Sequence, residues 1–299
     1  MTVKIHTLDL HFQDVPQSIA AYLVMGPDGP VLVETGPGST LENLKAAIQA
    51  HDVAVSDIKH VLVTHIHLDH AGAAGWWAQH GATVYVHQVG VPHLIDPSKL
   101  LASAGRIYGD KMDMLWGEML PAPAERVVAV ANNQQIEVAG LTFTALDTPG
   151  HAWHHHTYQL GNIAFTGDAA GIRLAGMPII DVPAPPPEFK LEVWEQTIDK
   201  LLGKNFEAIY PTHFGRIDDP KMQLLSLKQL MQDAVAFVRA QLLAGTERDA
   251  IVAAFNEWQR ARAEAKGMSP KEIHQYETAN PWYMSVDGIV RYWHKRTGT

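Results

Sequence analysis

Short apolar runs typical of strands alternate with stretches of helical periodicity in the first part of the chain. Residues 18–25 and 31–33 are apolar and flank a turn rich in Gly and Pro, which predicts a β-hairpin. Apolar residues at helical spacing follow the capping residues Ser39 and Thr40, which predicts a helix to about Ala50. The same criteria predict a strand at 60–64, a helix at 71–80 and a strand at 83–86. This alternation favours a sheet covered by helices.

Residues 88–124 break the alternation, and we expect them to form a partly helical insert over one end of the core. The segment contains four prolines and a run rich in Met and aromatic residues. This run has helical spacing, which fits either packing of the insert or an apolar wall for a substrate; its members are Tyr108, Met112, Met114, Leu115, Trp116 and Met119. Beyond the insert, strands are predicted at 126–130, 135–138, 141–146, 157–160, 162–166 and 206–210, with a helix at 188–202.

The last part of the chain has a helical pattern throughout. It predicts two long amphipathic helices and two shorter ones, which begin at Pro270 and Pro281. The sequence therefore predicts an α/β domain at 1–215 that contains the insert, followed by a helical extension at 216–299 that caps the site.

The amino-acid composition limits which active sites and binding partners the protein can have. The 299 residues carry 23 Lys and Arg against 32 Asp and Glu, and this net charge of −9 argues against non-specific binding to nucleic acid or anionic membranes. The lack of cysteine excludes disulfides, thiolate metal sites and a cysteine nucleophile. Residues 1–16 lack the apolar segment of a secretory signal, and no apolar run approaches the ~20 residues of a membrane span, so we expect a cytoplasmic protein.

The positions of several of the 17 histidines indicate a metal site. Within His65-Ile66-His67-Leu68-Asp69-His70, four side chains of metal-ligand type directly follow an apolar strand. His65 and His67 point to the same side of an extended chain, because the side-chain period of a strand is two. Asp69 and His70 are expected on the turn into the next helix. Imidazole and carboxylate together suit zinc, iron or manganese, whereas a chance cluster on a solvated loop is the alternative.

Three further candidate ligands each follow an apolar strand. His151 ends a Pro-Gly-His sequence, Asp168 ends Thr-Gly-Asp, and His213 ends Pro-Thr-His. Because each one comes directly after a strand, we expect all of them to meet the His65 cluster at one edge of the same sheet core.

In this order and spacing, the motifs HxHxDH, PGH, GD and PTH resemble those of the metallo-β-lactamase fold superfamily, over about residues 5–215. The resemblance implies a four-layer αββα sandwich that holds two divalent metal ions, with Zn²⁺ expected and iron or manganese as alternatives. The implied ligands are His65, His67 and His151 for the first ion and Asp69, His70 and His213 for the second, with Asp168 bridging them.

The resemblance also implies a metal-dependent hydrolase. Two close metal ions lower the pKa of a bridging water, so the expected nucleophile is hydroxide, which Asp69 would orient. The helical C-terminal extension resembles that of glyoxalase-II-like hydrolases, which cleave thioesters. We therefore expect hydrolysis of a thioester, ester or related acyl bond in a small-molecule substrate. His155, by its offset from His151, is a candidate for an additional contact at this site.

Other reactions of the superfamily stay open at this point. A mononuclear iron persulfide dioxygenase would use the same first three histidines. A lactonase, or a phosphodiesterase or ribonuclease-type hydrolase, would use the whole set. A binding module that kept the fold without activity is a further alternative. The aromatic residues near the C-terminus would either pack on the core or form a homodimer contact; they are Trp282, Tyr283, Tyr292 and Trp293.

Overall fold

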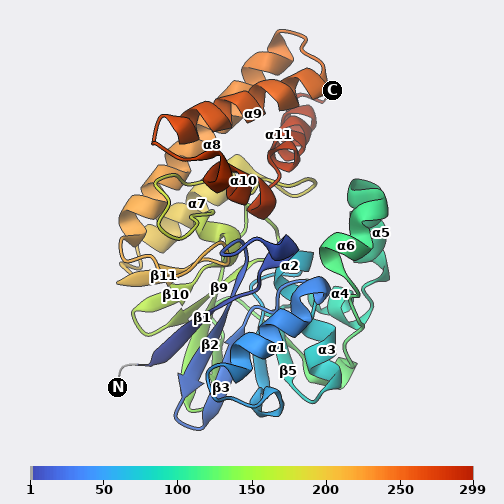
Figure 1. Ribbon diagram of the computed structural model, residues 1–299, viewed down its shortest axis with the longest axis vertical. Coiled ribbons are helices and arrows are strands. Elements are labelled where there is room, and N and C mark those ends of the chain that lie inside the picture. Colours follow the sequence, from blue (N-terminus) through green and yellow to red (C-terminus); the bar gives the residue numbers. More distant parts are fainter. Residues whose placement is uncertain (1–2, 299) are drawn as a thin grey trace.

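Two β-sheets face each other at the centre of the protein, and helices lie on their outer sides (Figure 1). The computed structural model describes residues 3–298. Within this range one sheet has six strands and the other has five. The predicted four-layer αββα arrangement is confirmed.

The six-stranded sheet joins an antiparallel part to a parallel part. Its strands in spatial order are β1 (Lys4–Asp9), β2 (Ala20–Gly26), β3 (Gly29–Val33), β4 (His60–Leu62), β5 (Thr83–His87) and β6 (Val127–Val130). The pairs β1–β2 and β2–β3 are antiparallel, whereas β3 to β6 run parallel. Parallel neighbours need crossover connections, which the intervening helices supply.

The five-stranded sheet is antiparallel except at one edge. Its strands in spatial order are β11 (Ala208–Tyr210), β10 (Ile163–Phe165), β9 (His156–Leu160), β8 (Leu141–Asp147) and β7 (Gln135–Val138). Only the pair β10–β11 is parallel among these strands.

Strand β2 illustrates how the layers pack. Tyr22 and Val24 point into the core between the sheets, where they share a cluster with Phe143 of β8. Leu23 points to the opposite face and packs in the cluster that contains Leu44 of α1 (Leu41–Gln49). Because both faces of the strand are buried, its sequence is a continuous apolar run without alternation.

Helices complete the outer layers. α1 and α3 (Ala74–Gln79) belong to the core cluster on the outer side of the six-stranded sheet. α7 (Leu191–Leu202) and α8 (Pro220–Leu243) share a cluster with the strands of the other sheet.

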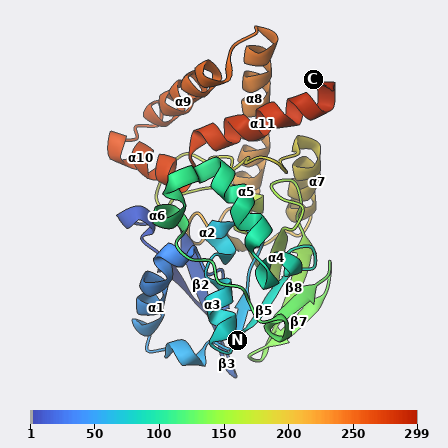
Figure 2. The same cartoon turned by 90° about the vertical axis from the view of Figure 1, so that its right-hand side faces the viewer.

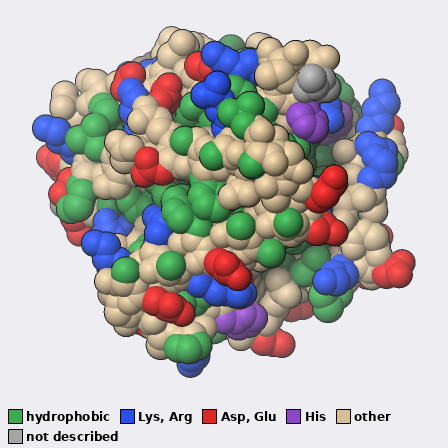
Figure 3. All heavy atoms as spheres, turned by 90° about the horizontal axis from the view of Figure 1, so that it is seen from above, with side chains coloured by type: hydrophobic (Ala, Val, Ile, Leu, Met, Phe, Trp, Pro, Cys, Tyr) green, Lys and Arg blue, Asp and Glu red, His purple; other side chains and the backbone are tan. Residues whose placement is uncertain are grey.

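Two helical segments lie at the end of the sandwich (Figure 2). The first comprises α4 (Val91–Ile95), α5 (Ser98–Tyr108) and α6 (Met112–Trp116), within the predicted insert. The second consists of α8 followed by α9 (Arg248–Glu264), α10 (Pro270–Ala279) and α11 (Trp282–Thr297). Charged side chains of both signs are spread over the face that these last helices form (Figure 3). No helix within residues 3–298 is long and apolar enough to cross a membrane.

The pattern analysis predicted no strand at residues 4–9, where the structure has β1. The strand lies at the edge of its sheet, and Leu8 is its one fully buried residue. Lys4, His6 and Asp9 interrupt any apolar run, so the sequence signal for a strand is weak there.

A buried carboxylate connects the C-terminal helices to the loop before α7. One oxygen of Asp181 accepts hydrogen bonds from the Val182 amide (2.8 Å) and Gln259 Nε2 (2.7 Å). The other oxygen accepts from Asn280 Nδ2 (2.9 Å) and Trp282 Nε1 (2.7 Å). Burial raises the pKa of Asp181, and these donors act against that shift because they favour the ionised form.

We expect Asp181→Ala to lower the free energy of unfolding by about 3 kcal/mol, because buried donors from α9, from the α10–α11 junction and from α11 would lose their acceptor. Urea denaturation of the purified protein measures the change. Asp57→Ala, at an exposed position remote from these helices, should shift stability by less than about 0.5 kcal/mol. Equal losses in both variants would contradict the role given to Asp181.

Candidate metal centre

Residues 63–71 leave the six-stranded sheet and turn into a short helix. β4 ends at Leu62, His67 is still extended, and α2 (Leu68–Ala71) carries both Asp69 and His70. These two residues therefore lie within a helical turn, one turn earlier than the helix start that we predicted near residue 71. The neighbouring Gly72 permits this close packing, since a Cβ there would lie 2.8 Å from Pro37 Cα.

The other candidate ligands come from the second sheet. His151 follows β8, Asp168 lies in a 3-10 turn at Gly167–Ala170 after β10, and His213 follows β11. The expectation that all ligands belong to one sheet is therefore wrong, because β4 lies in the six-stranded sheet and the other three strands do not. The ligands meet where adjoining ends of the two sheets face each other.

The structure brings all seven predicted ligands together. Asp168 lies at the middle of the group: its Oδ1 is 3.4 Å from His70 Nε2, and its Oδ2 is 3.3 Å from His151 Nε2. Asp69 Oδ2 is 3.4 Å from His213 Nε2. Ligand atoms lie within 4.8 Å of one another in each of three sets, namely His65, His67 and His151; Asp69, His70 and His213; and His65, His70 and Asp168.

Backbone carbonyls fix the orientation of two of the imidazoles. His151 Nδ1 is 2.7 Å from the carbonyl oxygen of Pro183, and His213 Nδ1 is 2.7 Å from that of Ser18. A carbonyl can only accept, so each Nδ1 carries the proton and each Nε2 presents its lone pair to the centre. Pro183 is two residues from Asp181, so the loop that orients His151 is the loop to which the C-terminal helices are bonded.

Glu34 forms the buried base of the centre, and the sequence analysis did not identify it. Its Oε1 is 3.3 Å from His70 Nδ1 and accepts hydrogen bonds from Thr64 Oγ1 (2.5 Å) and Thr212 Oγ1 (3.3 Å). A carboxylate in this position holds a ligating histidine in one orientation and increases its basicity. The signal available in the sequence was a lone acidic residue directly after the apolar strand β3.

His155 contacts the backbone of Asp168 and belongs to none of the ligand sets. Its Nε2 accepts a hydrogen bond from the Asp168 amide (3.2 Å), and its Nδ1 is 2.8 Å from Thr148 Oγ1. Gly167 makes this approach possible: its φ is +49°, and a Cβ there would lie 2.8 Å from His155 Nε2. His155 therefore supports the turn that presents Asp168.

Protonation of the histidines differs between the two ligand sets. Burial lowers the pKa of His65 well below its usual value and that of His67 to about 3, with neighbouring imidazoles adding to the effect. These rings are neutral at pH 7, which is the form that binds a metal. Burial also lowers the pKa of His70, but the negative charges of Asp69, Asp168 and Glu34 outweigh it and raise that pKa. The second set thus concentrates negative charge that a cation would neutralise.

The buried polar atoms fit divalent cations. His65 Nε2, His70 Nε2 and Asp168 Oδ1 are inaccessible to solvent and have no hydrogen-bond partner among the described residues. Buried polar atoms without partners are rare because each one is costly, and all three belong to the sets that could ligate an ion. Nitrogen and oxygen donors of this kind are the ones that zinc and its neighbours take.

A family comparison identifies the fold family of the chain. The family model described as the metallo-beta-lactamase superfamily matches residues 15–213, which include all seven predicted ligands. The chain belongs to the metallo-beta-lactamase superfamily. The predicted membership is confirmed, and with it the prediction of a hydrolytic enzyme. The superfamily fold also implies divalent-metal binding.

Individual superfamily members resemble the chain at low identity. A solved structure of family protein TTHA1429 from Thermus thermophilus has a TM-score of 0.72 at 20% identity and covers 98% of this chain and 94% of its own. Fold-containing protein ST1585 from Sulfurisphaera tokodaii is 23% identical over 76% of this chain and 84% of its own length. An atrochrysone carboxyl ACP thioesterase from Aspergillus fumigatus is 26% identical over 78% of this chain, which spans only 47% of that relative.

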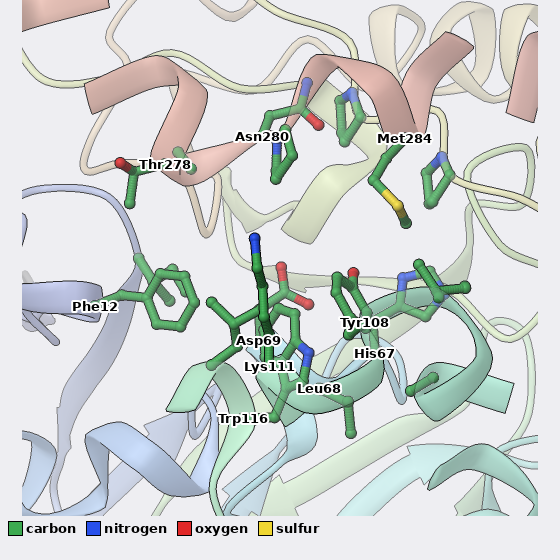
Figure 4. A pocket seen from close by; sticks show the side chains of 18 of the residues that line it. Phe12, His67, Leu68, Asp69, Tyr108, Lys111, Trp116, Thr278, Asn280 and Met284 are labelled. Atoms are coloured by element: carbon green, nitrogen blue, oxygen red, sulfur yellow. The ribbon is translucent and has the colours of Figure 1, made fainter. Parts of the chain in front are cut away.

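A cavity of about 430 Å³ adjoins the candidate metal ligands (Figure 4). His67, Asp69, His151, Asp168 and His213 contribute to its lining. Helices α5 and α6 form one side, and the junction of α10 and α11 forms the other.

Two further ring side chains, His87 and Trp153, do not line this cavity. His87 contacts Asp147 beside His156, and its Nδ1 accepts from the Val89 amide, so its Nε2 carries the proton when the ring is neutral. Trp153 is exposed, and Lys190 lies over its ring.

We expect Glu34→Gln to weaken metal binding by about 10- to 100-fold, because His70 loses its charged hydrogen-bond partner. Competition with a chromogenic chelator measures the affinity. Glu42→Gln, on the exposed side of α1, serves as the matched control and should bind metal like the wild type. Unchanged affinity in Glu34→Gln would show that this carboxylate does not support the centre.

Proposed function

We propose that the chain is a dinuclear metal-dependent hydrolase that cleaves a thioester, or a closely related acyl ester, in a small-molecule substrate. The observation that carries the proposal is the position of Asp168. Its two oxygens lie 3.4 Å and 3.3 Å from histidines that belong to the two separate ligand sets. A carboxylate between two sets is the arrangement expected for a pair of ions, most simply Zn²⁺.

Two divalent ions held by these sets would polarise a substrate carbonyl and lower the pKa of a bound water toward neutrality. The protein's own part is to position the reactants. Asp69 lines the cavity and is 3.4 Å from His213. Burial raises the pKa of Asp69, but the charges of His70 and His213 and the hydrogen bond from His213 outweigh burial and lower the pKa to about 2. Asp69 is therefore ionised at neutral pH and can accept a hydrogen bond from an attacking water, which orients that water toward an acyl carbon in the cavity.

An acyl bond is favoured over a phosphodiester for two reasons. The net charge of −9 and the near absence of Lys and Arg from the described cavity lining do not favour a phosphate backbone. One of the similar proteins is an ACP thioesterase. A chain without cysteine must activate water rather than use a thiol nucleophile, and hydrolysis of a thioester needs nothing more.

The test is hydrolysis of small acyl thioesters by the zinc-loaded protein. We expect activity that is lost on chelation and restored by Zn²⁺. Asp168→Ala should lower kcat/KM by more than about 100-fold, because loss of a direct ligand should exceed the effect of an outer partner.

Asp57→Ala is the control and should retain full activity, since its side chain is exposed and far from the ligands in the fold. If Asp168→Ala kept both its metal and its activity, the dinuclear assignment would be wrong. If the zinc-loaded wild type cleaved no thioester or ester, the reaction assignment would be wrong.

A further inference from the structure

The cavity over the candidate metal ligands has two walls that are far apart in sequence, one apolar and one that combines prolines and Met284 with polar side chains such as Thr278 and Asn280. On one side, Leu100, Ile107, Met114 and Trp116 come from α5 and α6. On the other side, prolines 183, 185, 186 and 187 and the α10–α11 junction complete the enclosure, with Met284 pointing into it (Figure 4). A volume of about 430 Å³ is enough to enclose much of a small organic group.

Part of the first wall exposes large apolar side chains to solvent. Ile107 is 39% exposed and Met114 is 61% exposed, and both line the cavity. Exposed side chains of this size next to a reactive centre mark a surface that gains stability when an apolar ligand covers it. Ordinary core packing does not account for them, because core residues would be covered by the protein itself.

Charged groups are sparse in this cavity above its metal-ligand floor. Among the described lining residues, Lys111 is the single Lys or Arg, and Glu277 is the acidic residue that is not a candidate ligand. A glutathione moiety carries two carboxylates and would need more than one cation to hold it. The lining therefore does not suit the anionic part of such a thioester.

We infer that this cavity binds the acyl part of the substrate, and that the substrate class is a thioester with a bulky apolar acyl group. The inference rests on the proposed function and specifies the substrate of the same site. The common acyl-carrying thiols, such as coenzyme A, phosphopantetheine and glutathione, bear phosphates or carboxylates. Their polar parts would remain outside these walls, while the thioester carbonyl lies at the ligand floor and the acyl chain extends between α5 and α11.

The experiment compares thioesters of N-acetylcysteamine that differ only in acyl length. Each buried methylene should contribute roughly threefold to fourfold to binding, so about four buried methylenes should raise kcat/KM about 100-fold from acetyl to octanoyl. S-lactoylglutathione should be cleaved more slowly than the octanoyl thioester. Equal rates for acetyl and octanoyl, or a preference for S-lactoylglutathione, would overturn the inference and leave the hydrolase assignment intact.

Ser103→Trp tests the location of the acyl group. Ser103 is half-buried on the cavity side of α5, whereas Ala102 next to it is exposed and does not line the cavity. We expect Ser103→Trp to lower the octanoyl-to-acetyl ratio at least about tenfold, while Ala102→Trp leaves it unchanged. Ile107→Asp should lower the same ratio by polarity rather than bulk. Ratios unaffected by both Ser103→Trp and Ile107→Asp would overturn the assignment of this cavity.

A binding measurement separates the cavity from the reaction. S-octyl-N-acetylcysteamine has a thioether in place of the thioester, so it offers no acyl carbon on sulfur to an attacking water, and calorimetry gives its Kd. We expect the wild type to bind it, and Ser103→Trp to weaken binding at least about tenfold relative to Ala102→Trp. Binding of this kind without any thioester hydrolysis would overturn the reaction but support the apolar ligand. No binding and no hydrolysis would overturn both.

Discussion

The structure depends on the meeting of two β-sheets at a buried group of five imidazoles and two carboxylates. Such groups are costly to bury without compensation, because unpaired polar atoms and like charges both raise the free energy of the folded state. Hydrogen-bond partners hold the outer nitrogens of His70, His151 and His213, whereas His65 Nε2, His70 Nε2 and Asp168 Oδ1 have none among the described residues. Under the dinuclear proposal, a pair of divalent cations would remove both costs at once, since it would engage the free nitrogen and oxygen atoms and neutralise the carboxylates. Metal binding and docking of the sheets would then be coupled.

The partners behind the ligands give the centre its rigidity. Glu34 lies behind His70, and the carbonyls of Pro183 and Ser18 lie behind His151 and His213. The Pro183 loop is itself bonded through Asp181 to the C-terminal helices. The helical extension therefore contributes to the centre in two ways, by closing the substrate cavity and by holding one of the ligands in place.

Much of the candidate centre could be predicted from the sequence because its ligands follow strands in short motifs. The HxHxDH segment and the isolated His151, Asp168 and His213 each follow a predicted strand in the sequence. In the structure each of them also follows a strand. The assignment of strands to two sheets could not be predicted in this way, because the apolar run of a strand does not show which other strand it pairs with. The edge strand β1 was not predicted, because a strand with a single fully buried residue has almost no pattern of alternating apolar positions.

Other features required the three-dimensional structure. Glu34 is a single acid after a strand, and nothing in its neighbourhood distinguishes it from a turn residue. The Asp181 network joins residues that are 78 to 101 positions apart. The cavity similarly joins α5 and α6 to the α10–α11 junction, although α6 ends at Trp116 and α10 begins only at Pro270. The Met and aromatic run near Trp116 has both predicted roles, because Met119 packs in the core while Met114 lines the cavity.

The most direct measurement of the central claim is anomalous diffraction from crystals of protein purified without added metal or chelator. The account predicts two anomalous peaks about 3.5–4 Å apart. One should lie among His65, His67 and His151, the other among Asp69, His70 and His213, with Asp168 between them. A single peak in the first set, in crystals also soaked in Zn²⁺, would contradict the dinuclear centre. The absence of any peak would contradict the metal site altogether.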